Sequence, residues 1–390
     1  MSKRVLFVGH SAHRSGAPLI LLNFLRWLKV HDAPRFDVML VESGPLLGEF
    51  ADVAPTEVLN RPMTRRQRLA RRVLRSRYTE RQERAFVHRL ARERYDLAWV
   101  NTVVPKREIL ALAGIGVPVV CHVHELSFAI GQWLGPDGLT PLVAPVAHFV
   151  AASEAVQTEL VQRWHVPTEK VSVVHEFTLS SNPEIDSTAR NRVRAAIGLT
   201  DDNVVVGGCG TLDWRKGADL FLQIARTIAR RGGEAKRRMH FLWLGAERGS
   251  VDYREFMHDL ERSGLTGCVT VMESTPRPAD VFAAMDIFAL TSREDPFPLV
   301  MLEAAALKLP MVCFAGSGGG PEFAEIGGGL VVPYLDVPAF AECMVELAGD
   351  AARRRAIGAS AARAVEQFTI DRQAPKLRAV MEAVMARRPR

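Results

Sequence analysis

Residues 290–322 read LTSREDPFPLVMLEAAALKLPMVCFAGSGGGPE, and this stretch decides the fold. Its first residue ends an apolar run, 286–290, which is typical of a buried strand. An acidic turn follows, and the segment 299–308 then consists mainly of strong helix formers. Pro310 ends that helix, and 311–315 is a second apolar run. The order strand, helix, strand predicts one right-handed crossover of a parallel sheet.

A glycine loop follows the second strand. Gly318, Gly319 and Gly320 precede Pro321, and a proline after glycines is typical of a helix start. Backbone N–H groups at the N-terminus of a helix bind anions, so this loop is a candidate phosphate site.

Two carboxylates lie on either side of the crossover's first turn. Asp295 is in the turn and Glu303 is eight residues later, on the helix. Both can face the crevice at the carboxyl ends of the strands, where open α/β sheets bind ligands. Carboxylates accept hydrogen bonds from sugar hydroxyls. Together with a phosphate site, these acids indicate a nucleotide-sugar site.

The segment 292–312, SREDPFPLVMLEAAALKLPMV, resembles the signature of the retaining, nucleotide-sugar-dependent glycosyltransferases of the GT-B fold, family 4. Those enzymes carry an acid, seven residues and then Glu, followed by a small-residue helix and a P-x-V strand. The first acid is usually Glu, whereas this chain has Asp295 preceded by Glu294, and either could contact the donor sugar. Phe297, in the same turn, is a further candidate for donor binding. The resemblance is looser elsewhere but extends over nearly the whole chain.

The chain, at 390 residues, is long enough for two domains, and strand-like and helical segments alternate in both halves. We therefore expect an α/β protein with an N-terminal domain over 1–178 and a C-terminal domain over 188–368. The resemblance implies two Rossmann-like domains whose parallel sheets face an interdomain cleft. It also implies that the first domain binds the acceptor and the second the nucleotide sugar. The amphipathic tail, 369–390, would pack back on the N-terminal domain.

A second loop of the C-terminal half carries basic residues. The segment 210–217, GTLDWRKG, joins a predicted strand to a helix start, where charge and helix dipole together favour a diphosphate. The resemblance assigns the phosphate-binding lysine to Lys216. Arg215 would supply the cation that the family often has at the position of Thr211. The alternative is a solvated basic pair at a helix start.

Histidines stand out in the N-terminal half. His122 and His124 alternate at the end of a predicted strand and so can point to one side. The resemblance matches His124 to a histidine close to the donor sugar, while either ring could instead be packed at the strand end. The first loop, 10–17, resembles the family's glycine-bearing loop near the donor, and Gly16 is the residue that carries this match. The alternative is that 10–17 only connects a strand to a helix.

Several chemistries are not indicated. The chain has no G-x-G-x-x-G and no Walker A motif, which argues against a dinucleotide oxidoreductase and a P-loop nucleotidase. No D-x-D and no metal-ligand spacing occur, so we expect neither a metal nor any other cofactor. Five cysteines without a C-x-x-C pair suit a reducing compartment. No signal peptide or long apolar run is present, and we expect a cytoplasmic protein.

The positive charge is concentrated in one segment. Residues 61–94 hold thirteen arginines and three acids, a net charge of +10, whereas the whole chain carries +6. Apolar residues recur there at helical spacing, which predicts a basic amphipathic helix. Such a face can be merely solvated, can bind nucleic acid, or can contact an anionic bilayer or a lipid-diphosphate acceptor. We favour the third alternative, with possible peripheral contact at the inner face of the membrane, and expect no nucleic acid partner.

These patterns and the resemblance lead to one main hypothesis. The protein would be a retaining hexosyltransferase that moves a sugar from a nucleotide-sugar donor to a glycan, lipid-linked or small-molecule acceptor, in polysaccharide or glycolipid assembly. His124, Lys216 and Asp295 would be catalytic, and Glu303 would bind the ribose. Two alternatives remain open, namely a GT-B epimerase or phosphorylase and a non-catalytic subunit that binds nucleotide sugar.

Overall fold

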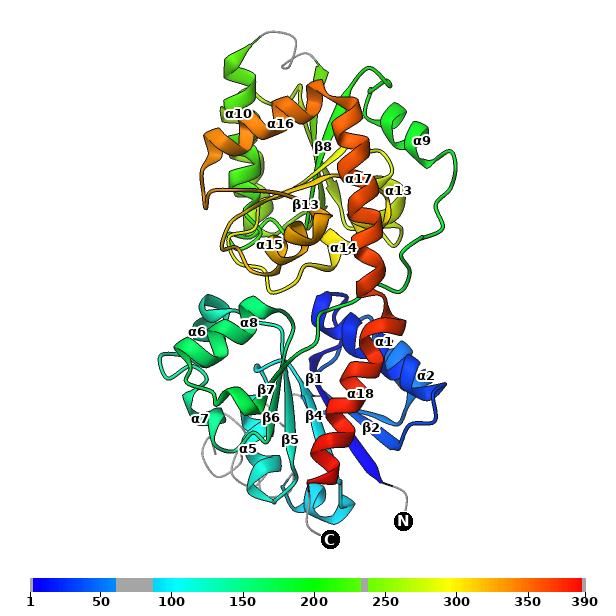
Figure 1. Ribbon diagram of the computed structural model, residues 1–390, viewed down its shortest axis with the longest axis vertical. Coiled ribbons are helices and arrows are strands. Elements are labelled where there is room, and N and C mark those ends of the chain that lie inside the picture. Colours follow the sequence, from blue (N-terminus) through cyan, green and yellow to red (C-terminus); the bar gives the residue numbers. More distant parts are fainter. Residues whose placement is uncertain (1–2, 61–86, 233–237, 388–390) are drawn as a thin grey trace. The chain divides into compact units, whose positions relative to one another are not determined.

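The computed structural model describes residues 3–60, 87–232 and 238–387 (Figure 1). Most of the arginine-rich segment, residues 61–86, therefore lies outside the described residues. The chain forms two compact units. The N-terminal unit consists of Met1–His175 with Ile370–Arg390, and the C-terminal unit consists of Glu176–Thr369. Within the described ranges, no helix has the length and hydrophobicity that crossing a bilayer requires.

The N-terminal unit is built on a parallel sheet with the strand order β3-β2-β1-β4-β5-β6-β7 in the described part of the chain. Its strands are β1 (Arg4–Ser11), β2 (Arg35–Glu42), β3 (Thr56–Val58), β4 (Leu97–Asn101), β5 (Val119–Val123), β6 (His148–Ala151) and β7 (Val171–Val173). Its helices are α1 (Gly16–Lys29), α2 (Leu47–Val53), α5 (Lys106–Gly114), α6 (Ser127–Leu134), α7 (Thr140–Val143), α8 (Glu154–Thr158), η1 (Glu159–Arg163), η2 (Thr168–Lys170) and α18 (Ile370–Ala386).

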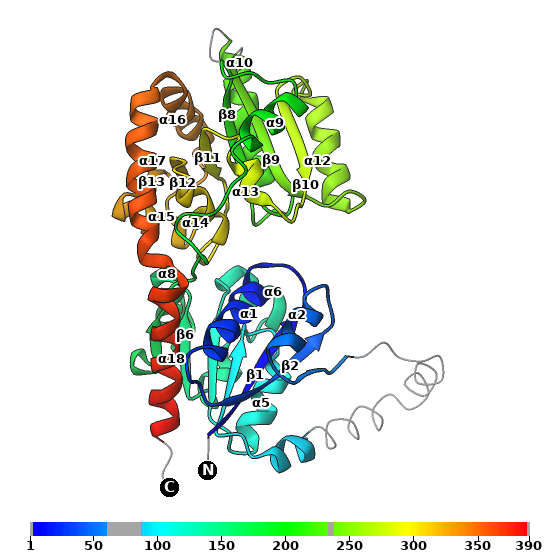
Figure 2. The same cartoon turned by 90° about the vertical axis from the view of Figure 1, so that its right-hand side faces the viewer.

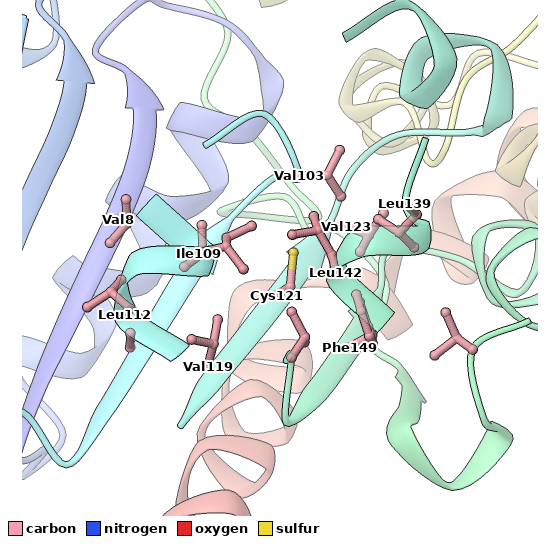
Figure 3. Packing of buried hydrophobic residues seen from close by; sticks show 14 of the residues in the cluster. Val8, Val103, Ile109, Leu112, Val119, Cys121, Val123, Leu139, Leu142 and Phe149 are labelled. Carbon is pink, nitrogen blue, oxygen red and sulfur yellow. The ribbon is translucent and has the colours of Figure 1, made fainter. Parts of the chain in front are cut away.

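The side chains of β5 alternate between two environments. Cys121 and Val123 point into an apolar cluster that includes Ile109 of α5 and Leu142 of α7 (Figure 3). His122, between them in sequence, packs its ring against Trp99 of β4, with ring centroids 5.6 Å apart. The period of two along a strand thus separates a purely apolar face from a face that carries histidine.

The last helix, α18, belongs to the N-terminal unit. It packs against α1 and β4, and the guanidinium of Arg378 donates to the carbonyls of His31 and Asp32 (Figure 2). Leu377 and Met381, one helical turn apart, are fully buried. The apolar stripe of an amphipathic tail is therefore covered by the first helix and the sheet.

The C-terminal unit has a parallel sheet with the order β10-β9-β8-β11-β12-β13 among the described residues. Its strands are β8 (Val204–Cys209), β9 (Met239–Ala246), β10 (Val269–Glu273), β11 (Ile287–Leu290), β12 (Met311–Phe314) and β13 (Gly329–Val332). Its helices are α9 (Ala189–Ala196), α10 (Ala218–Arg231), α12 (Val251–Arg262), α13 (Pro278–Phe282), α14 (Leu299–Ala306), α15 (Gly319–Phe323), η3 (Ala324–Gly328), α16 (Val337–Gly349), α17 (Ala351–Val365) and η4 (Glu366–Phe368).

Helices cover both faces of this second sheet. One apolar cluster lies under α10, α12 and α16, and another lies under α13, α14 and α17. The predicted α/β class, with two Rossmann-like units built on parallel sheets, is confirmed.

The strand order reverses once in each sheet, between β1 and β4 and between β8 and β11. Open α/β sheets bind ligands beyond the carboxyl ends of the strands at this switch point, because the connecting loops diverge there. In the C-terminal unit, the two loops at the switch point are 210–217 and 291–298. These are the basic loop and the acidic turn that the sequence pattern singled out.

Candidate functional site

The basic loop after β8 is held tightly against the end of β11. Gly217 has the left-handed φ of +67°, and a Cβ at this position would lie 2.0 Å from the carbonyl oxygen of Thr291. Only glycine satisfies both conditions. The carboxylate of Asp213 accepts from the Lys216 backbone N–H at 2.9 Å and also from the Thr211 hydroxyl. The loop conformation is thereby fixed around Lys216.

The two cations of this loop converge on Asp295. Lys216 Nζ donates to Asp295 Oδ2 at 2.6 Å, and Arg215 Nη1 lies 3.6 Å from Oδ1. Ser292 Oγ also donates to Oδ2, at 3.2 Å. Asp295 is only 5% exposed, and burial alone would raise its pKa. The nearby charges of Lys216 and Arg215, with the hydrogen bonds, outweigh burial and hold that pKa below its usual value, so the carboxylate is ionised.

The glycine loop is fastened to the same turn. The Asp295 backbone N–H donates to Ser317 O at 2.8 Å, and the Gly319 N–H donates to Asp295 O at 3.1 Å. A Cβ on Gly319 would lie 2.4 Å from Pro296 O, so a larger residue would push the loop away from the turn. Glycine here serves the close approach of two backbones.

The Gly319 N–H therefore already donates to an acceptor within the protein. Among the described residues, the amides of Gly318 and Gly320 have no acceptor outside their own helix. A Cβ on Gly320 would lie 2.9 Å from a methyl group of Leu290, which again favours glycine. Of the three predicted phosphate-binding amides, these two are the ones that remain for a ligand.

Glu303 projects from α14 as an unpaired acid. Its carboxylate makes no hydrogen bond or ion pair within the part of the chain that the structure describes. Burial raises its pKa from 4.5 to about 7. Its charge adds to burial in raising the pKa of Cys209, which lies at the end of β8. An acid without a protein partner near the switch point can accept hydrogen bonds from ligand hydroxyls.

The other candidates in the acidic turn have different surroundings. Glu294 accepts from Arg215 through its backbone carbonyl, at 3.2 Å. Phe297 is 1% exposed and lies in the apolar core, with its ring centroid 5.0 Å from that of Phe368. Its side chain therefore packs beneath the turn and is not presented at its surface.

The sequence patterns did not predict one further ion pair in this unit. Arg293 makes two hydrogen bonds of 2.7 Å to the carboxylate of Asp219, in the first turn of α10. The same guanidinium stacks on Trp214, 5.0 Å from the ring centroid. This bidentate pair ties the acidic turn to the helix that follows the basic loop. The two residues are 74 positions apart, so no local motif could reveal the contact.

His124 lies in the N-terminal unit, just beyond the end of β5. Its Nε2 is 3.0 Å from Asn101 Oδ1, and its ring centroid is 4.0 Å from that of His122. Burial, followed by the charge of His124, lowers the pKa values of both His10 and His122, that of His10 to about 4. These two rings are therefore neutral at neutral pH.

Gly16 is the exposed first residue of α1. A Cβ there would meet nothing within 4 Å, so packing does not require glycine at this position. Gly16 and His124 both belong to the N-terminal unit, whereas the other candidates belong to the C-terminal unit.

Metal sites and cavities are the remaining kinds of candidate site. Among the described residues, no three His, Cys, Asp or Glu side chains are arranged to hold a metal ion. A cavity of about 770 Å³ lies in the N-terminal unit, beside α5 and the end of β3. Lys106, Glu108 and Asn60 are among its lining residues, and none of the predicted site residues lines it.

Two family models match this chain. Residues 203–350 match the family described as Glycosyl transferases group 1, and residues 35–177 match Glycosyltransferase Family 4. The D-inositol 3-phosphate glycosyltransferase of Stackebrandtia nassauensis is 28% identical over 278 residues, which is 67% of this chain and 61% of that protein. The protein of the same name from Kineococcus radiotolerans is 29% identical over 65% of this chain and 63% of its own length. The chain thus spans less than two thirds of the length of these relatives.

Solved structures share the whole fold. The Anabaena protein HepE, in complex with UDP and glucose, superposes with a TM-score of 0.77 at 21% identity, and the match covers 100% of both chains. Sucrose-phosphate synthase from Thermosynechococcus elongatus superposes with a TM-score of 0.76 at 18% identity, over 98% of this chain and 99% of that one. At this level of identity the similarity shows the fold.

Proposed function

This chain belongs to the group 1 and family 4 glycosyltransferases of the GT-B fold, and we propose that it transfers a sugar from a nucleotide-sugar donor with retention of the anomeric configuration. The acceptor would be a glycan, a lipid-linked or a small molecule. Its named relatives act on D-inositol 3-phosphate, and HepE binds UDP and glucose. The first observation supports a hydroxyl-bearing acceptor for this chain, and the second supports a nucleoside-diphosphate donor.

The contact between Lys216 and Asp295 carries the proposal. A buried acid and two cations meet at the switch point of the C-terminal unit, 2.6 Å and 3.6 Å apart. In the proposed complex the diphosphate takes over the ammonium of Lys216 and the guanidinium of Arg215. Asp295, released from Lys216, accepts hydrogen bonds from the sugar hydroxyls. The unpaired carboxylate of Glu303 accepts those of the ribose.

The reaction breaks the bond between C1 of the sugar and the diphosphate oxygen. A bond forms between C1 and the acceptor oxygen, and the acceptor's proton passes to the leaving diphosphate. Negative charge grows on the diphosphate during this step, and in the proposed complex Lys216 and Arg215 would lie beside it. Cations that already contact the diphosphate in the bound complex lower the barrier, because they need not reorient during the chemical step.

Contact with an anionic membrane surface remains part of the proposal for the arginine-rich segment 61–94. Its support is compositional, since thirteen arginines lie within it and most of it is outside the described residues. Such a surface would bring a lipid-linked acceptor to the protein.

The proposed function is tested with a panel of nucleotide sugars. Release of nucleoside diphosphate is followed with and without candidate acceptors, and the anomeric configuration of any product is determined by NMR. We expect one donor to give acceptor-dependent release and a product of retained configuration. Tight nucleotide binding without release for any donor would instead indicate a binding subunit, and inversion would contradict the retaining mechanism.

A further inference from the structure

Asn101 connects three elements of the N-terminal unit at the carboxyl edge of its sheet. It is the last residue of β4, is 1% exposed and pairs with His122 of β5 in the sheet register. Its side-chain Nδ2 donates to the carbonyl of Ala17, in the first turn of α1, at 2.9 Å. Its Oδ1 lies 3.0 Å from Nε2 of His124.

These two contacts place a proton on Nε2 of His124. A backbone carbonyl can only accept, so the contact with Ala17 orients the amide with its NH₂ group toward α1. The amide oxygen then faces the imidazole and can only accept as well. Nε2 of His124 must therefore carry a hydrogen. A neutral ring with its proton on Nε2 has its lone pair on Nδ1.

The surroundings hold His124 in place from the backbone side. Glu125 is 8% exposed, and its carboxylate accepts from the backbone N–H groups of His124, at 3.0 Å, and Val103, at 3.4 Å. Thr102, between Asn101 and Val103, has a φ of +95°, which is rare for a β-branched residue. Backbone strain of this kind persists only where the surrounding structure enforces it, and it is concentrated at functional sites.

We propose that Asn101 is a positioning residue, which orients the His124 ring and keeps a proton on its Nε2. The consequence for transfer rests on the proposed function together with the family resemblance, which matches His124 to a histidine close to the donor sugar. Asn101 itself then touches neither substrate and acts through the histidine alone. Its loss should reduce kcat and leave the KM for the donor nearly unchanged, because binding groups on the C-terminal unit are untouched.

The tautomer is measured directly by ¹⁵N NMR of histidine-labelled protein at about pH 8, where an ordinary histidine is neutral. The His124 signals are assigned by their loss in His124→Gln. We expect the Nε2-protonated form in the wild type and a mixture of both tautomers in Asn101→Leu, with kcat lowered about 10-fold and donor KM changed less than about 2-fold. Asn101→Asp keeps an acceptor at Nε2 but loses the donor to Ala17 O, so it should retain the proton on Nε2 and recover only part of the rate.

Ser172→Ala is the matched control. Ser172 is the partner of another histidine in the same unit, His148, at 2.9 Å. This variant should change the His148 signals and leave the His124 signals and the transfer rate unaltered.

Several results would overturn the inference. They are an Nδ1-protonated His124 in the wild type, an unchanged tautomer in a folded Asn101→Leu, or an equal loss of rate in Ser172→Ala. If Asn101→Leu does not fold, the wild type and Asn101→Asp still decide the tautomer. If no nucleotide sugar is turned over, the proposed function fails, while the spectra decide the inference independently.

Discussion

Lys216 Nζ lies 2.6 Å from Asp295 Oδ2, although the two residues are 79 positions apart in the chain. The contact joins the loop after β8 to the turn after β11, on either side of the switch point. Both charges are largely buried, with side-chain exposures of 16% and 7%. A buried ion pair is costly to break, because removal of one partner leaves the other charged and desolvated.

We predict that substitutions of Lys216 and Asp295 have coupled effects on the free energy of unfolding. Lys216→Met leaves Asp295 with Arg215 as its remaining cation and should lower the free energy of unfolding by about 3 kcal/mol, the lower end for a broken buried pair. Asp295→Asn should also destabilise the protein, since it leaves the Lys216 ammonium with a weaker acceptor. The double variant should lose less than the sum of the two, by about 1–3 kcal/mol. Urea unfolding of the four proteins measures this.

The control for this cycle is an exposed pair. Arg353 and Glu346 lie 3.0 Å apart with side chains 43% and 56% exposed, and Arg353→Gln should change stability by less than about 0.5 kcal/mol. Strictly additive losses for Lys216 and Asp295 would mean that their contact contributes nothing to the fold.

Glu303 should make stability depend on pH. Its pKa is raised from 4.5 to about 7 in the folded protein, so between these values the folded form holds a proton that the unfolded form releases. Stability from this group is therefore lost as pH rises from about 5 to 7. Glu303→Gln removes this loss and should be the more stable protein at pH 8, with the difference vanishing toward pH 4. Urea unfolding across this pH range checks it.

The same substitution separates stability from function. If Glu303 binds the ribose, Glu303→Gln should weaken donor binding by about 1–3 kcal/mol while it stabilises the free protein at pH 8. Calorimetric titration with the donor found in the panel gives this value. Equal donor affinity in both proteins would assign Glu303 a structural role.

Gly217 should be far more sensitive to substitution than an ordinary left-handed glycine. Gly264 has a similar φ, +69°, but a Cβ there meets nothing within 4 Å. Gly264→Ala should therefore cost only the backbone strain, about 1–2 kcal/mol. Gly217→Ala adds a clash with Thr291 O, so it should lower the free energy of unfolding by at least about 1–3 kcal/mol more. It should also weaken nucleotide binding, because the clash displaces Lys216. Similar unfolding midpoints for the two variants would contradict the close packing of the loop.

The fold was predictable because its signals are local. An apolar run, a helix bounded by Pro310 and a glycine loop each follow from neighbouring residues, and their order alone predicts a parallel crossover. Local patterns do not show with which unit α18 packs. That placement came only from the family resemblance.

The site was predictable only in part, for the same reason. Lys216, Asp295 and Glu303 each stand in a recognisable segment, but nothing local says that Lys216 touches Asp295. Phe297 lies in the same turn as the acids. An aromatic side chain in such a turn can point to the surface or pack beneath the turn, and the structure shows that Phe297 is buried in the core. The partnership of Asn101 with His124 joins the ends of two strands, so it emerges only when the sheet is assembled.

The arginine-rich segment gives a prediction that depends on ionic strength. If 61–94 contacts an anionic bilayer, the protein should co-sediment with anionic vesicles at low salt and be released at high salt, because each arginine contributes roughly 1 kcal/mol that salt screens. Replacing Arg65, Arg66, Arg68, Arg71 and Arg72 with Gln should abolish sedimentation. Equal binding to neutral and anionic vesicles, or none, would leave a freely diffusing acceptor as the default.

The most direct test of the proposed site is the rate of sugar transfer by Asp295→Asn, measured beside its affinity for the nucleoside diphosphate. Asparagine keeps the size of the side chain but loses the charge that binds Lys216 in the free protein and would bind the sugar hydroxyls in the complex. We predict that kcat falls about 100-fold, the scale for removing one preorganised electrostatic contact, while the diphosphate binds within about 3-fold of wild type. Transfer at the wild-type rate by a folded Asp295→Asn protein would contradict the assignment of this site.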